Sequence, residues 1–577
     1  MAQESLDKKS LIVSGGASGI QWSDENLAIN QQWDITTDLL VAGTGAAALG
    51  AAIAGADEEA KVLVVESTDK WGGTTFLSGG GFWLPDNPVM QREGACDAKE
   101  EALKYMENVV HDVGPASSRA RKMAFLMGVA DPVNTLQKYG IEFIRSKVYP
   151  DYFSHLPGGS YGRALEIKAF DIKKLGDWYE KTRHDEIIPL PLNTDDFAEL
   201  ARGITNPKGL LRALRVAGRT AKGMLAGRKL RGMGVALSSA LMHVVRKQGT
   251  PVWLNSPITK LIVDDGVVVG AIVNKEGKDV RVRTTKGVFL GTGGFARNAE
   301  WRKKYHGIPG WSAAAPGDDG SGIQVGIDAG AEVAMMHLAW GAPTIPFLGD
   351  DSRGVLLIWE RSMPHSVMID QHGNRFINEA LPYVEFIQEV LDHNKDVPCV
   401  PSWIVTDHRH AKKYVNLAST VGIDKLKQAG TIIEAPTLRE LAQKINVPSD
   451  NLEATVERFN GFARKGVDED FHRGENPYEN YYGDPSYPNA NLGELSVGPF
   501  RALKMMPGDI GTKGGLLTDE YARVLDKSGQ PIAGLYAGGN TTASVMGQTY
   551  PGPGSTLGPA LVFGFIGGRH AAKHGDL

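Results

Sequence analysis

A chain of 577 residues is too long for one hydrophobic core, so we expect at least two domains. The hydrophobic content of 42% and the charged content of 22% are typical of globular proteins, and the net charge of −5 argues against a nucleic-acid-binding protein. Two cysteines, Cys96 and Cys399, are too few and too far apart for a disulfide framework or a zinc site, so we expect no metal.

The first 34 residues form a polar, charged tail without the apolar core of a secretory signal. No stretch of the chain approaches eighteen consecutive apolar residues, so we expect no membrane span. Together with the low cysteine content, these features favour a cytoplasmic location.

A dinucleotide-binding unit is predicted directly after the tail. Its parts are a strand at Leu39–Ala42, the glycine turn Gly43-Thr-Gly45, a small-residue helix at Leu49–Ala54, a strand at Val62–Val65, and Glu66. In such a unit Gly43 would make the turn, Gly45 would let the pyrophosphate approach, and Glu66 would bind the ribose hydroxyls. The complete strand–turn–helix–strand–acid context makes this prediction far more specific than a glycine pattern alone.

Three further glycine-rich segments favour FAD over NAD. They are Gly72-Gly-Thr-Thr75 with Ser78-Gly-Gly-Gly81, the strand end Gly287–Gly294, and the strand end Gly534–Asn540. A second glycine loop soon after the acid suits a flavin whose pyrophosphate and ribityl chain cross it. The predicted FAD-binding residues are Gly43, Gly45, Ala46, Ala47, Glu66, Ser67, Gly72, Gly73, Thr74, Thr75, Ser78, Gly79, Gly80, Gly293, Gly294, Gly539, Asn540, Leu557 and Gly558.

Because these segments lie far apart in the sequence, we predict an α/β fold in which a Rossmann-like FAD-binding domain is split by an insertion. The FAD-binding domain would comprise residues 35–343 and 511–577. Residues 344–510, with mixed strands and helices and many Pro, Tyr and Asn residues, would form a smaller α+β substrate or catalytic domain. Helices are predicted around Ala98–Val113 and Ser118–Tyr139, and strands at Ile258–Val263 and Val267–Val273.

A basic segment lies within an insertion at about residues 185–240. Between Thr205 and Leu237 there is no acidic residue. The basic residues are Lys208, Arg212, Arg215, Arg219, Lys222, Arg228, Lys229 and Arg231, and the apolar residues Leu210, Leu214, Ala217, Ala221 and Leu225 recur at helical spacing. A basic amphipathic helix is typical of peripheral membrane binding. A solvated helix, or a contact between subunits, stays open as the alternative, since Gly209, Gly218, Gly223 and Gly227 weaken an isolated helix.

The segment Tyr550-Pro-Gly-Pro-Gly554 predicts a pair of hydrogen-bond donors. Glycine allows close approach of the backbone to a flat ligand and leaves peptide N–H groups accessible. A tyrosine hydroxyl beside such an N–H can donate to the same carbonyl oxygen. We therefore expect Tyr550 and Gly554 to stabilise negative charge on a substrate carbonyl.

The chain resembles the flavoprotein family of fumarate reductases and 3-ketosteroid dehydrogenases, with motifs closest to those of the Δ1-dehydrogenases. The motifs are Trp71-Gly-Gly-Thr-Thr75, Tyr149-Pro-Asp-Tyr152, Asn374-Arg-Phe-Ile-Asn-Glu-Ala-Leu-Pro-Tyr383, Phe471-His-Arg-Gly474, Gly511-Thr-Lys-Gly-Gly515 and Tyr550-Pro-Gly-Pro-Gly554. The resemblance covers nearly the whole chain from Asp38, apart from a segment near 185–240. It implies catalytic roles for Tyr152, Tyr383, Tyr550 and Gly554. Phe153 and Ser555-Thr556 depart from the commoner residues without affecting these four.

The resemblance implies 1,2-desaturation of a 3-ketosteroid with FAD as the cofactor. The ketone would be enolised through Tyr550 and Gly554, Tyr383 would remove the proton from C2, Tyr152 would assist Tyr383, and hydride from C1 would pass to FAD. A ketosteroid Δ4-(5α)-dehydrogenase and a fumarate reductase-type flavoprotein are the alternatives. The electron acceptor is expected to be a quinone or an electron-transfer protein. The oligomeric state, including a homo-oligomer, and a location at the inner face of the cell membrane stay open.

Overall fold

The computed structural model describes residues 11–12, 33–203, 206–347, 350–415 and 422–575. Most of the predicted tail, residues 1–10 and 13–32, and position 205 of the basic segment lie outside these ranges. No helix in the described ranges is long and apolar enough to cross a membrane.

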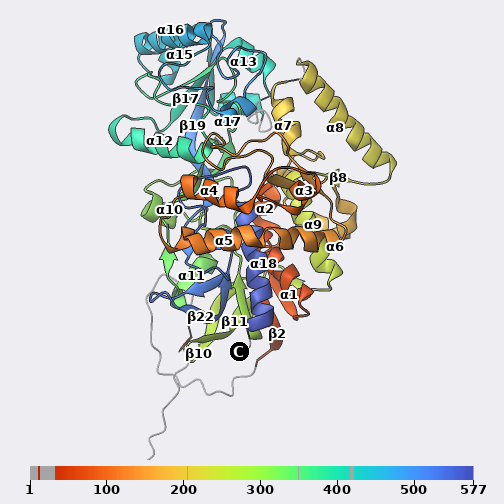
Figure 1. Cartoon of the computed structure of the whole chain (residues 1–577). Helices are drawn as coiled ribbons and strands as arrows, with labels where there is room; N and C mark the ends of the chain where they lie inside the picture. The colour runs from red at the N-terminus through yellow and green to blue at the C-terminus, as the bar shows by residue number, and fades with distance from the viewer. Residues whose placement is uncertain (1–10, 13–32, 204–205, 348–349, 416–421, 576–577) are drawn as a thin grey trace, which may run out of the picture.

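The larger unit is built on a parallel sheet that assembles segments from both ends of the chain (Figure 1). Its parallel strands run in the order β22 (Pro531–Ala537), β12 (Lys278–Leu290), β2 (Ile35–Ala42), β3 (Val62–Val65) and β9 (Val252–Trp253). β11 (Val267–Lys275), β10 (Ile258–Asp264) and β1 (Leu11–Ile12) extend the sheet in antiparallel fashion, and β21 (Arg523–Leu525) pairs with β22. β3 is buried at every residue, as expected for a strand covered on both faces. The predicted α/β fold is confirmed.

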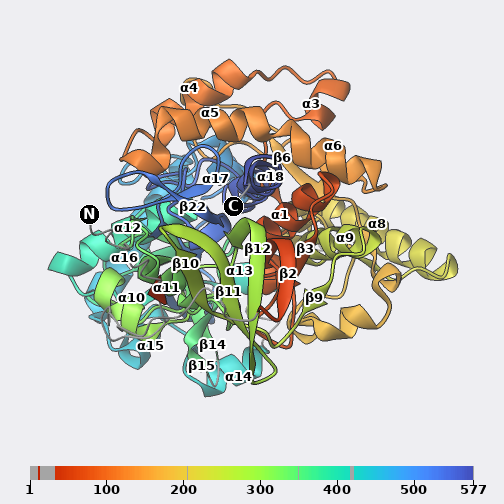
Figure 2. The same cartoon turned by 90° about the horizontal axis from the view of Figure 1, so that it is seen from below.

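Two helices from opposite ends of the sequence pack closely on this sheet. α1 (Ala46–Asp57) and α18 (Leu557–His574) lie side by side (Figures 1 and 2). A Cβ atom added at Gly564 would lie 2.3 Å from the carbonyl oxygen of Ala47, and one at Gly568 would lie 2.3 Å from that of Ala51. Only glycine permits this approach. The close packing brings the glycine turn after β2 next to the C-terminal segment that contains Tyr550.

The smaller unit contains a six-stranded antiparallel sheet. Its order is β15 (Asp350–Leu356), β14 (Ala339–Phe347), β19 (Phe500–Thr512), β17 (Ser402–Thr406) and β16 (Ser366–Ile369), and β18 (Ile432–Ala435) also pairs with β19. The predicted domain boundaries at 343/344 and 510/511 fall inside β14 and β19, so the chain passes between the units within strands. The exact division into domains stays a prediction.

Helices surround both sheets. In the larger unit and its insertion they are α2 (Gly73–Leu77), α3 (Pro88–Arg92), α4 (Lys99–Val109), α5 (Arg119–Gly128), α6 (Ala130–Lys138), α7 (Thr194–Ala201), α8 (Pro207–Leu225), α9 (Met233–Lys247), α10 (Ala299–His306) and α11 (Ser321–Asp328). In the smaller unit they are α12 (Tyr383–Asp396), α13 (His408–Lys413), α14 (Ile423–Gln428), α15 (Leu438–Ile445), α16 (Ser449–Lys465) and α17 (Pro477–Tyr481). A small sheet of β4 (Phe82–Trp83), β6 (Ala164–Ile167) and β5 (Phe143–Arg145) lies in the larger unit.

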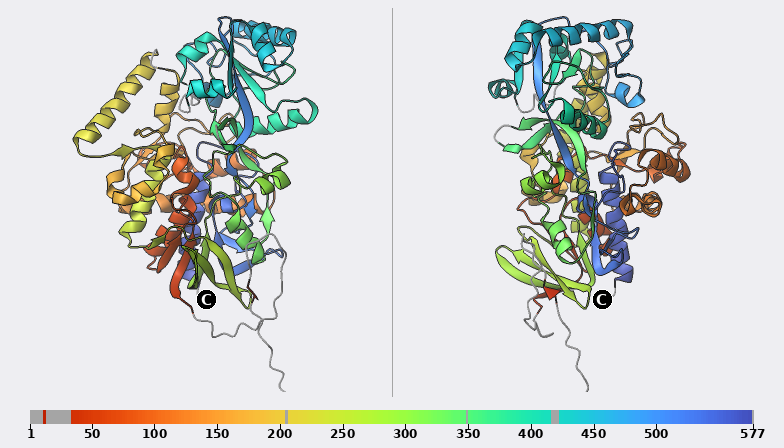
Figure 3. Two further views of the ribbon diagram at one scale, coloured as in Figure 1. Left: turned by 180° about the vertical axis from the view of Figure 1, so that it is seen from behind. Right: turned by 90° about the vertical axis from the view of Figure 1, so that its left-hand side faces the viewer.

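The basic segment divides into two different structures. α8 projects from the edge of the molecule in Figure 1 and in the left panel of Figure 3, whereas α9 is buried against α1 and α2. Leu237, assigned from sequence to the basic segment, therefore belongs to the core. Two of the three glycines of α8 lie where the helix packs: a Cβ atom at Gly209 would be 2.2 Å from the Gly203 carbonyl oxygen, and one at Gly223 would be 2.9 Å from Leu230. Gly209 and Gly223 therefore favour docking of the helix, whereas Gly218 is exposed and a Cβ atom there would meet nothing within 4 Å.

Candidate active site

One large cavity extends between the two units and receives all four glycine-rich segments. It contains about 1950 Å³ of empty space, its open mouth included. One end is lined by the turns after β2 and β3, and the other by tyrosine and aliphatic side chains.

The turn after β2 has the geometry of a pyrophosphate-binding loop. Gly43 has a φ of +102°, and a Cβ atom there would lie 2.3 Å from the carbonyl oxygen of Gly291. The hydroxyl of Thr44 donates to the Glu66 carboxylate at 2.5 Å, and the backbone N–H of Gly72 donates to the Thr44 hydroxyl at 2.9 Å. Thr44 thus ties the turn to the acid at the end of β3 and to the second glycine loop.

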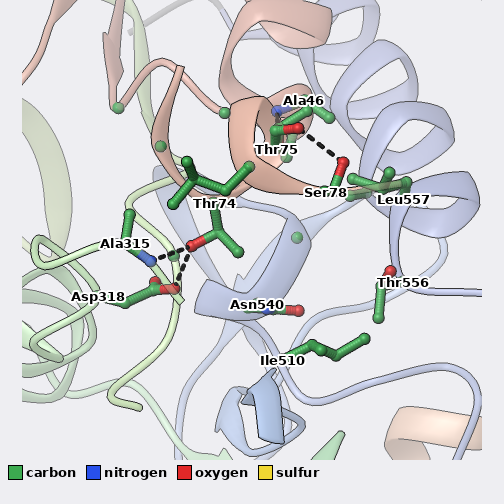
Figure 4. Close-up of a pocket in the computed structure, with 18 of the residues that line it drawn as sticks. Ala46, Thr74, Thr75, Ser78, Ala315, Asp318, Ile510, Asn540, Thr556 and Leu557 are labelled. Atoms are coloured by element: carbon green, nitrogen blue, oxygen red, sulfur yellow. Dashed lines mark hydrogen bonds between the residues drawn. The ribbon is translucent and has the colours of Figure 1, made fainter. Parts of the chain in front are cut away.

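The second glycine loop begins α2 and contacts two other segments of the lining (Figure 4). The Thr75 hydroxyl accepts a hydrogen bond from the backbone N–H of Ala46 at 3.0 Å. The Thr74 hydroxyl donates to the Asp318 carboxylate at 2.7 Å and accepts from the backbone N–H of Ala315 at 3.0 Å. Burial raises the pKa of Asp318 to about 6, with the hydrogen bond from Thr74 acting in the opposite direction.

Most of the predicted FAD-binding residues line this cavity. They are Gly43, Gly45, Ala46, Ala47, Glu66, Ser67, Gly73, Thr74, Thr75, Ser78, Gly79, Gly80, Gly293, Gly539, Asn540 and Leu557. Gly72, Gly294 and Gly558 lie behind the lining. At Gly294 a Cβ atom would lie 2.0 Å from the Thr512 hydroxyl oxygen, and at Gly558 one would lie 2.3 Å from the Trp83 carbonyl oxygen.

The residues present fit FAD. A Cβ atom added at Gly73 or Gly79 would meet nothing within 4 Å, so both glycines leave open space against the cavity rather than serving packing. The N-terminus of α1 faces the same space through Ala46 and Ala47, as in sites that bind a pyrophosphate. Glu66 would hold the ribose, the turns at Gly43 and Gly45 the pyrophosphate, and the second glycine loop the ribityl chain.

At the other end of the cavity three buried tyrosines meet. Tyr152 comes from the loop before β6, Tyr383 begins α12, and Tyr550 precedes α18. The Tyr152 hydroxyl donates to the Tyr383 hydroxyl at 3.0 Å. The ring centroid of Tyr550 lies 4.8 Å from that of Tyr383 and 5.2 Å from that of Tyr152. The structure thus brings together residues that are up to 398 positions apart in the sequence.

Backbone and ionic contacts hold the loop that carries Tyr152. The backbone N–H of Tyr152 donates to the Pro551 carbonyl at 2.9 Å. The neighbouring Asp151 is fully buried and forms an ion pair of 2.7 Å with Arg163, which also binds Asp97 at 2.7 Å. This loop is therefore fixed directly against the loop of Tyr550.

Gly554 has a geometry that only glycine can adopt. Its φ is +90°, and a Cβ atom would lie 2.3 Å from the carbonyl oxygen of Gly81. Burial raises the pKa of the Tyr550 hydroxyl, whereas hydrogen bonding from Tyr383, Thr556 and the Gly554 backbone lowers it. Tyr550 and Gly554 both line the cavity, and their role as a donor pair stays a prediction.

Burial also governs the titration of the other two tyrosines. The pKa of Tyr383 is raised well above 10 by burial, with a contribution from Tyr550 in the same direction, while the hydrogen bond from Tyr152 lowers it. The pKa of Tyr152 is likewise raised by burial. At rest the cluster is therefore uncharged at neutral pH.

Sequence reasoning missed several residues of this cavity. Tyr482 and Tyr149 line it, and their hydroxyls lie 2.5 Å apart. Tyr478 lies behind the lining, fully buried, with its ring centroid 4.2 Å from that of Tyr152. Asp318 and the aliphatic residues Leu356, Ile358 and Ile510 were also not predicted. Tyr149 stands in the Tyr149-Pro-Asp-Tyr152 motif and could have been selected; the others belong to no motif.

The charges of the lining are confined to one end. Within the described part of the chain, Arg183 is the only lysine or arginine that lines the cavity, and it donates to Thr68 and to the carbonyl of Lys70 near Glu66. No group of histidine, cysteine and acidic side chains suited to a metal occurs among the described residues. The tyrosine end is therefore neutral and mostly apolar.

Comparisons with known proteins agree with this geometry. A family model described as FAD binding domain matches residues 38–557. The 3-oxosteroid 1-dehydrogenase of Mycolicibacterium smegmatis is 39% identical over 92% of this chain and 96% of its own. The 4-oxocyclohexanecarboxylate 2-dehydrogenase of Sinomonas cyclohexanicum is 35% identical over 93% of each chain. The crystal structure of 3-ketosteroid delta1-dehydrogenase from Sterolibacterium denitrificans, in complex with 1,4-androstadiene-3,17-dione, superposes with a TM-score of 0.86 at 34% identity, over 93% of this chain and 99% of that one.

The fold and the dinucleotide cradle define an FAD-dependent oxidoreductase. Within that class, the chain belongs to the family of the 3-oxosteroid 1-dehydrogenases.

Replacing Glu66 tests the predicted FAD-binding site. Its carboxylate accepts hydrogen bonds from Thr44, Ser67 and Thr68, and it is oriented towards the cavity end expected to hold the ribose. A hydrogen bond to a charged group contributes about 1.5–3 kcal/mol. Glu66→Ala should therefore lower the affinity for FAD about 10- to 150-fold without changing substrate selectivity. Flavin fluorescence during titration of the apoprotein measures this. Glu142→Ala, which removes an exposed ion pair with Lys168, is the control; equal FAD affinity in the two variants would contradict the assignment.

Proposed function

We propose that the protein desaturates 3-ketosteroids between C1 and C2, converting a 3-keto-4-ene into a 1,4-diene. The contact of Tyr152, Tyr383 and Tyr550 at the neutral end of the FAD cavity carries this proposal. The relatives' activities support it, since both named dehydrogenases act next to a ring ketone.

The difficulty of the reaction is removal of hydrogen from a saturated carbon. A ketone one bond away acidifies that carbon because the carbanion is delocalised as an enolate. The Tyr550 hydroxyl and the Gly554 N–H would donate to the ketone oxygen and stabilise the charge as it forms. One such donor contributes about 3 kcal/mol to lowering the barrier. Both residues belong to the lining of the same cavity, which supports their joint role.

Tyr383 is the proposed base for the C2 proton. Its hydroxyl accepts a hydrogen bond from Tyr152, which stabilises the tyrosinate form that the reaction needs. Its ring also lies beside that of Tyr550, so the base and the ketone-binding donor can act on neighbouring atoms of one substrate ring. FAD supplies the acceptor for the hydride that leaves C1.

The charge of the cavity separates the alternatives. A fumarate reductase must bind two carboxylates, which calls for several cationic side chains. The single arginine of the described lining lies at the Glu66 end instead. A neutral, apolar ketone suits the tyrosine end better. Desaturation on the other side of the carbonyl, as in a Δ4-(5α)-dehydrogenase, stays the nearest alternative, and identification of the product by mass spectrometry and NMR separates the two.

The surface of α8 supports peripheral membrane contact. The side of this helix that packs on the protein contains Gly209, Val216 and Gly223. The apolar residues on its other side are exposed, namely Leu210, Leu211, Leu214, Ala217, Ala221, Met224 and Leu225. Lys208, Arg215 and Lys222 are exposed beside them. An outward apolar stripe flanked by cations suits an anionic membrane surface, from which a poorly soluble steroid could be taken up.

Two of the basic residues have a different role. Arg212 and Arg219 both form ion pairs with the buried Asp196, at 3.3 and 2.8 Å. These two ion pairs connect α8 to α7, so the cations of α8 that can meet lipid head groups are Lys208, Arg215 and Lys222. A location at the inner face of the cell membrane and an electron acceptor of the quinone or electron-transfer-protein class belong to this proposal. A homo-oligomer that covers α8 is the alternative to membrane contact.

The ketone-binding role of Tyr550 can be tested by Tyr550→Phe. The variant loses one donor, so turnover with androst-4-ene-3,17-dione and an artificial acceptor should fall about 100- to 1,000-fold. The flavin content should be unchanged, because the ring remains in place. Turnover close to that of the unmodified protein would contradict the ketone-binding role of Tyr550.

Exchange of the C2 hydrogens with deuterated solvent tests the base. In Tyr383→Phe the exchange, followed by NMR with the flavin kept oxidised, should fall to background. Tyr152→Phe should slow it less, because only the stabilising hydrogen bond is lost. Undiminished exchange in Tyr383→Phe would place the base elsewhere.

Sedimentation with anionic liposomes tests α8. Replacing Lys208, Arg215 and Lys222 by Gln removes about 1 kcal/mol of attraction each, or about 100-fold in partitioning, and binding should fade with salt. Replacing Leu210, Leu214 and Leu225 by Gln should abolish binding at any salt. The control changes the exposed Lys278, Lys303 and Lys304 to Gln. Equal, salt-insensitive partitioning of all variants would favour a solvated helix or a contact between subunits.

A further inference from the structure

A buried lysine lies behind the tyrosine cluster and has no role in the reaction described above. Lys513 follows β19 in the Gly511-Thr-Lys-Gly-Gly515 motif and is fully buried. Its ammonium group donates to the carbonyl oxygens of Thr549 at 2.5 Å and Gly547 at 3.1 Å. It also lies 4.3 Å from the ring centroid of Trp340. Burial of a charge costs free energy unless hydrogen bonds and charges compensate, so this position is not explained by packing alone.

Glu385 approaches the same segment from the other unit. It lies in the first turn of α12, two residues after Tyr383, and its carboxylate accepts the hydroxyl of Thr549 at 2.5 Å. Burial raises the pKa of Glu385, whereas hydrogen bonding from Thr549 and from the Tyr550 backbone, and the charge of Lys513, lower it. Lys513 therefore binds the carbonyl oxygen of the Thr549–Tyr550 peptide, while the Glu385 carboxylate accepts a hydrogen bond from the N–H of the same peptide.

This double contact determines where the Tyr550 ring can lie. Trp340 packs its edge on Tyr550 with ring centroids 5.3 Å apart, and its indole N–H donates to Asn540 at 3.0 Å. Lys513 covers the Trp340 ring and Glu385 belongs to the helix that begins with Tyr383. The pair thus connects the backbone of the ketone-binding tyrosine to the helix of the base.

We infer that Lys513 and Glu385 are positioning residues, which hold the Tyr550 hydroxyl where it can donate to the substrate ketone while Tyr383 reaches the adjacent carbon. The inference rests on the proposed function, because it assigns Tyr550 the ketone. Burial lowers the pKa of Lys513 to about 7, and the Glu385 carboxylate opposes this shift. The two groups therefore depend on each other and should behave as one unit.

The experiment compares Lys513→Met, Glu385→Gln and the double variant with the unmodified holoenzyme. Steady-state turnover of androst-4-ene-3,17-dione gives kcat and KM. Bound androsta-1,4-diene-3,17-dione gives a second readout, because the ultraviolet band of its conjugated ketone moves to longer wavelength as hydrogen bonding to the oxygen strengthens. Lys122→Met is the matched control: Lys122 is also buried and donates to a backbone carbonyl, but that carbonyl belongs to His111 and not to the segment that carries Tyr550.

Each single variant should lose kcat about 10- to 100-fold, as for a reacting group displaced by a fraction of an ångström, with KM changed less than about threefold. The double variant should be no worse than the poorer single variant, because the two residues hold one peptide. The band shift of the bound dienone should shrink in all three variants, while flavin content and the Lys122→Met kcat stay unchanged.

Two results would overturn the inference. One is a kcat in both single variants equal to that of Lys122→Met. The other is a loss of kcat that only parallels loss of flavin, with the dienone band unaltered. If Lys513→Met does not fold, the nearly isosteric Glu385→Gln carries the same test. Absence of desaturation by the unmodified protein would instead refute the proposed function, so the two failures are distinguishable.

Discussion

The contact among three buried tyrosines is the interaction on which the rest of the site depends. Each ring comes from a different stretch of chain, and each stretch is held by its own buried ionic group. Asp151 with Arg163 holds the Tyr152 loop. Glu379, paired with Arg375 and Arg473, lies in the segment that leads into Tyr383. Glu385 and Lys513 contact the residue before Tyr550. Since buried ion pairs often add little net stability over apolar packing, we attribute the two ion-paired groups to geometric specificity. Glu385 and Lys513 add hydrogen bonds to the third segment.

Glycine provides the second constraint. The cavity must admit a dinucleotide between strands and helices that would otherwise touch, and the chain meets this demand by removing side chains where backbones approach. Gly43 beside Gly291 and Gly554 beside Gly81 both have positive φ and no room for a Cβ atom. Gly73 and Gly79 instead leave open space. The same residue type therefore serves close packing at one set of positions and ligand access at another.

Much of the FAD cradle could be predicted from the sequence because its signals are local: β2, its glycine turn, β3 and Glu66 lie within about thirty residues. Tyr550 could be selected from its glycine-rich segment, whereas Tyr152 and Tyr383 could be found only through the family motifs. Tyr482, Tyr478 and Asp318 belong to no motif, and their contacts, such as that of Asp318 with Thr74 across 244 positions, depend on the tertiary fold. The boundaries fell within β14 and β19 because a 13-residue strand such as β19 serves both units. The sequence also could not predict that the apolar stripe of α8 is exposed, because this depends on which side of the helix packs on the protein.

Tyrosine is an unusual base, and its surroundings explain how it can serve. An uncharged phenol is compatible with an apolar cavity that must accept a neutral ketone, whereas a carboxylate there would carry a desolvation cost in every unliganded molecule. The same burial raises the pKa of Tyr383 and so reduces the fraction present as tyrosinate. Each pKa unit by which the Tyr152 hydrogen bond lowers that value increases this fraction about tenfold. In the proposed reaction the negative charge then passes from Tyr383 to the ketone oxygen between Tyr550 and Gly554. The tyrosine end of the cavity therefore carries one negative charge at a time, next to a hydroxyl donor, and Tyr152 and Tyr550 are the donors at the two ends of that transfer.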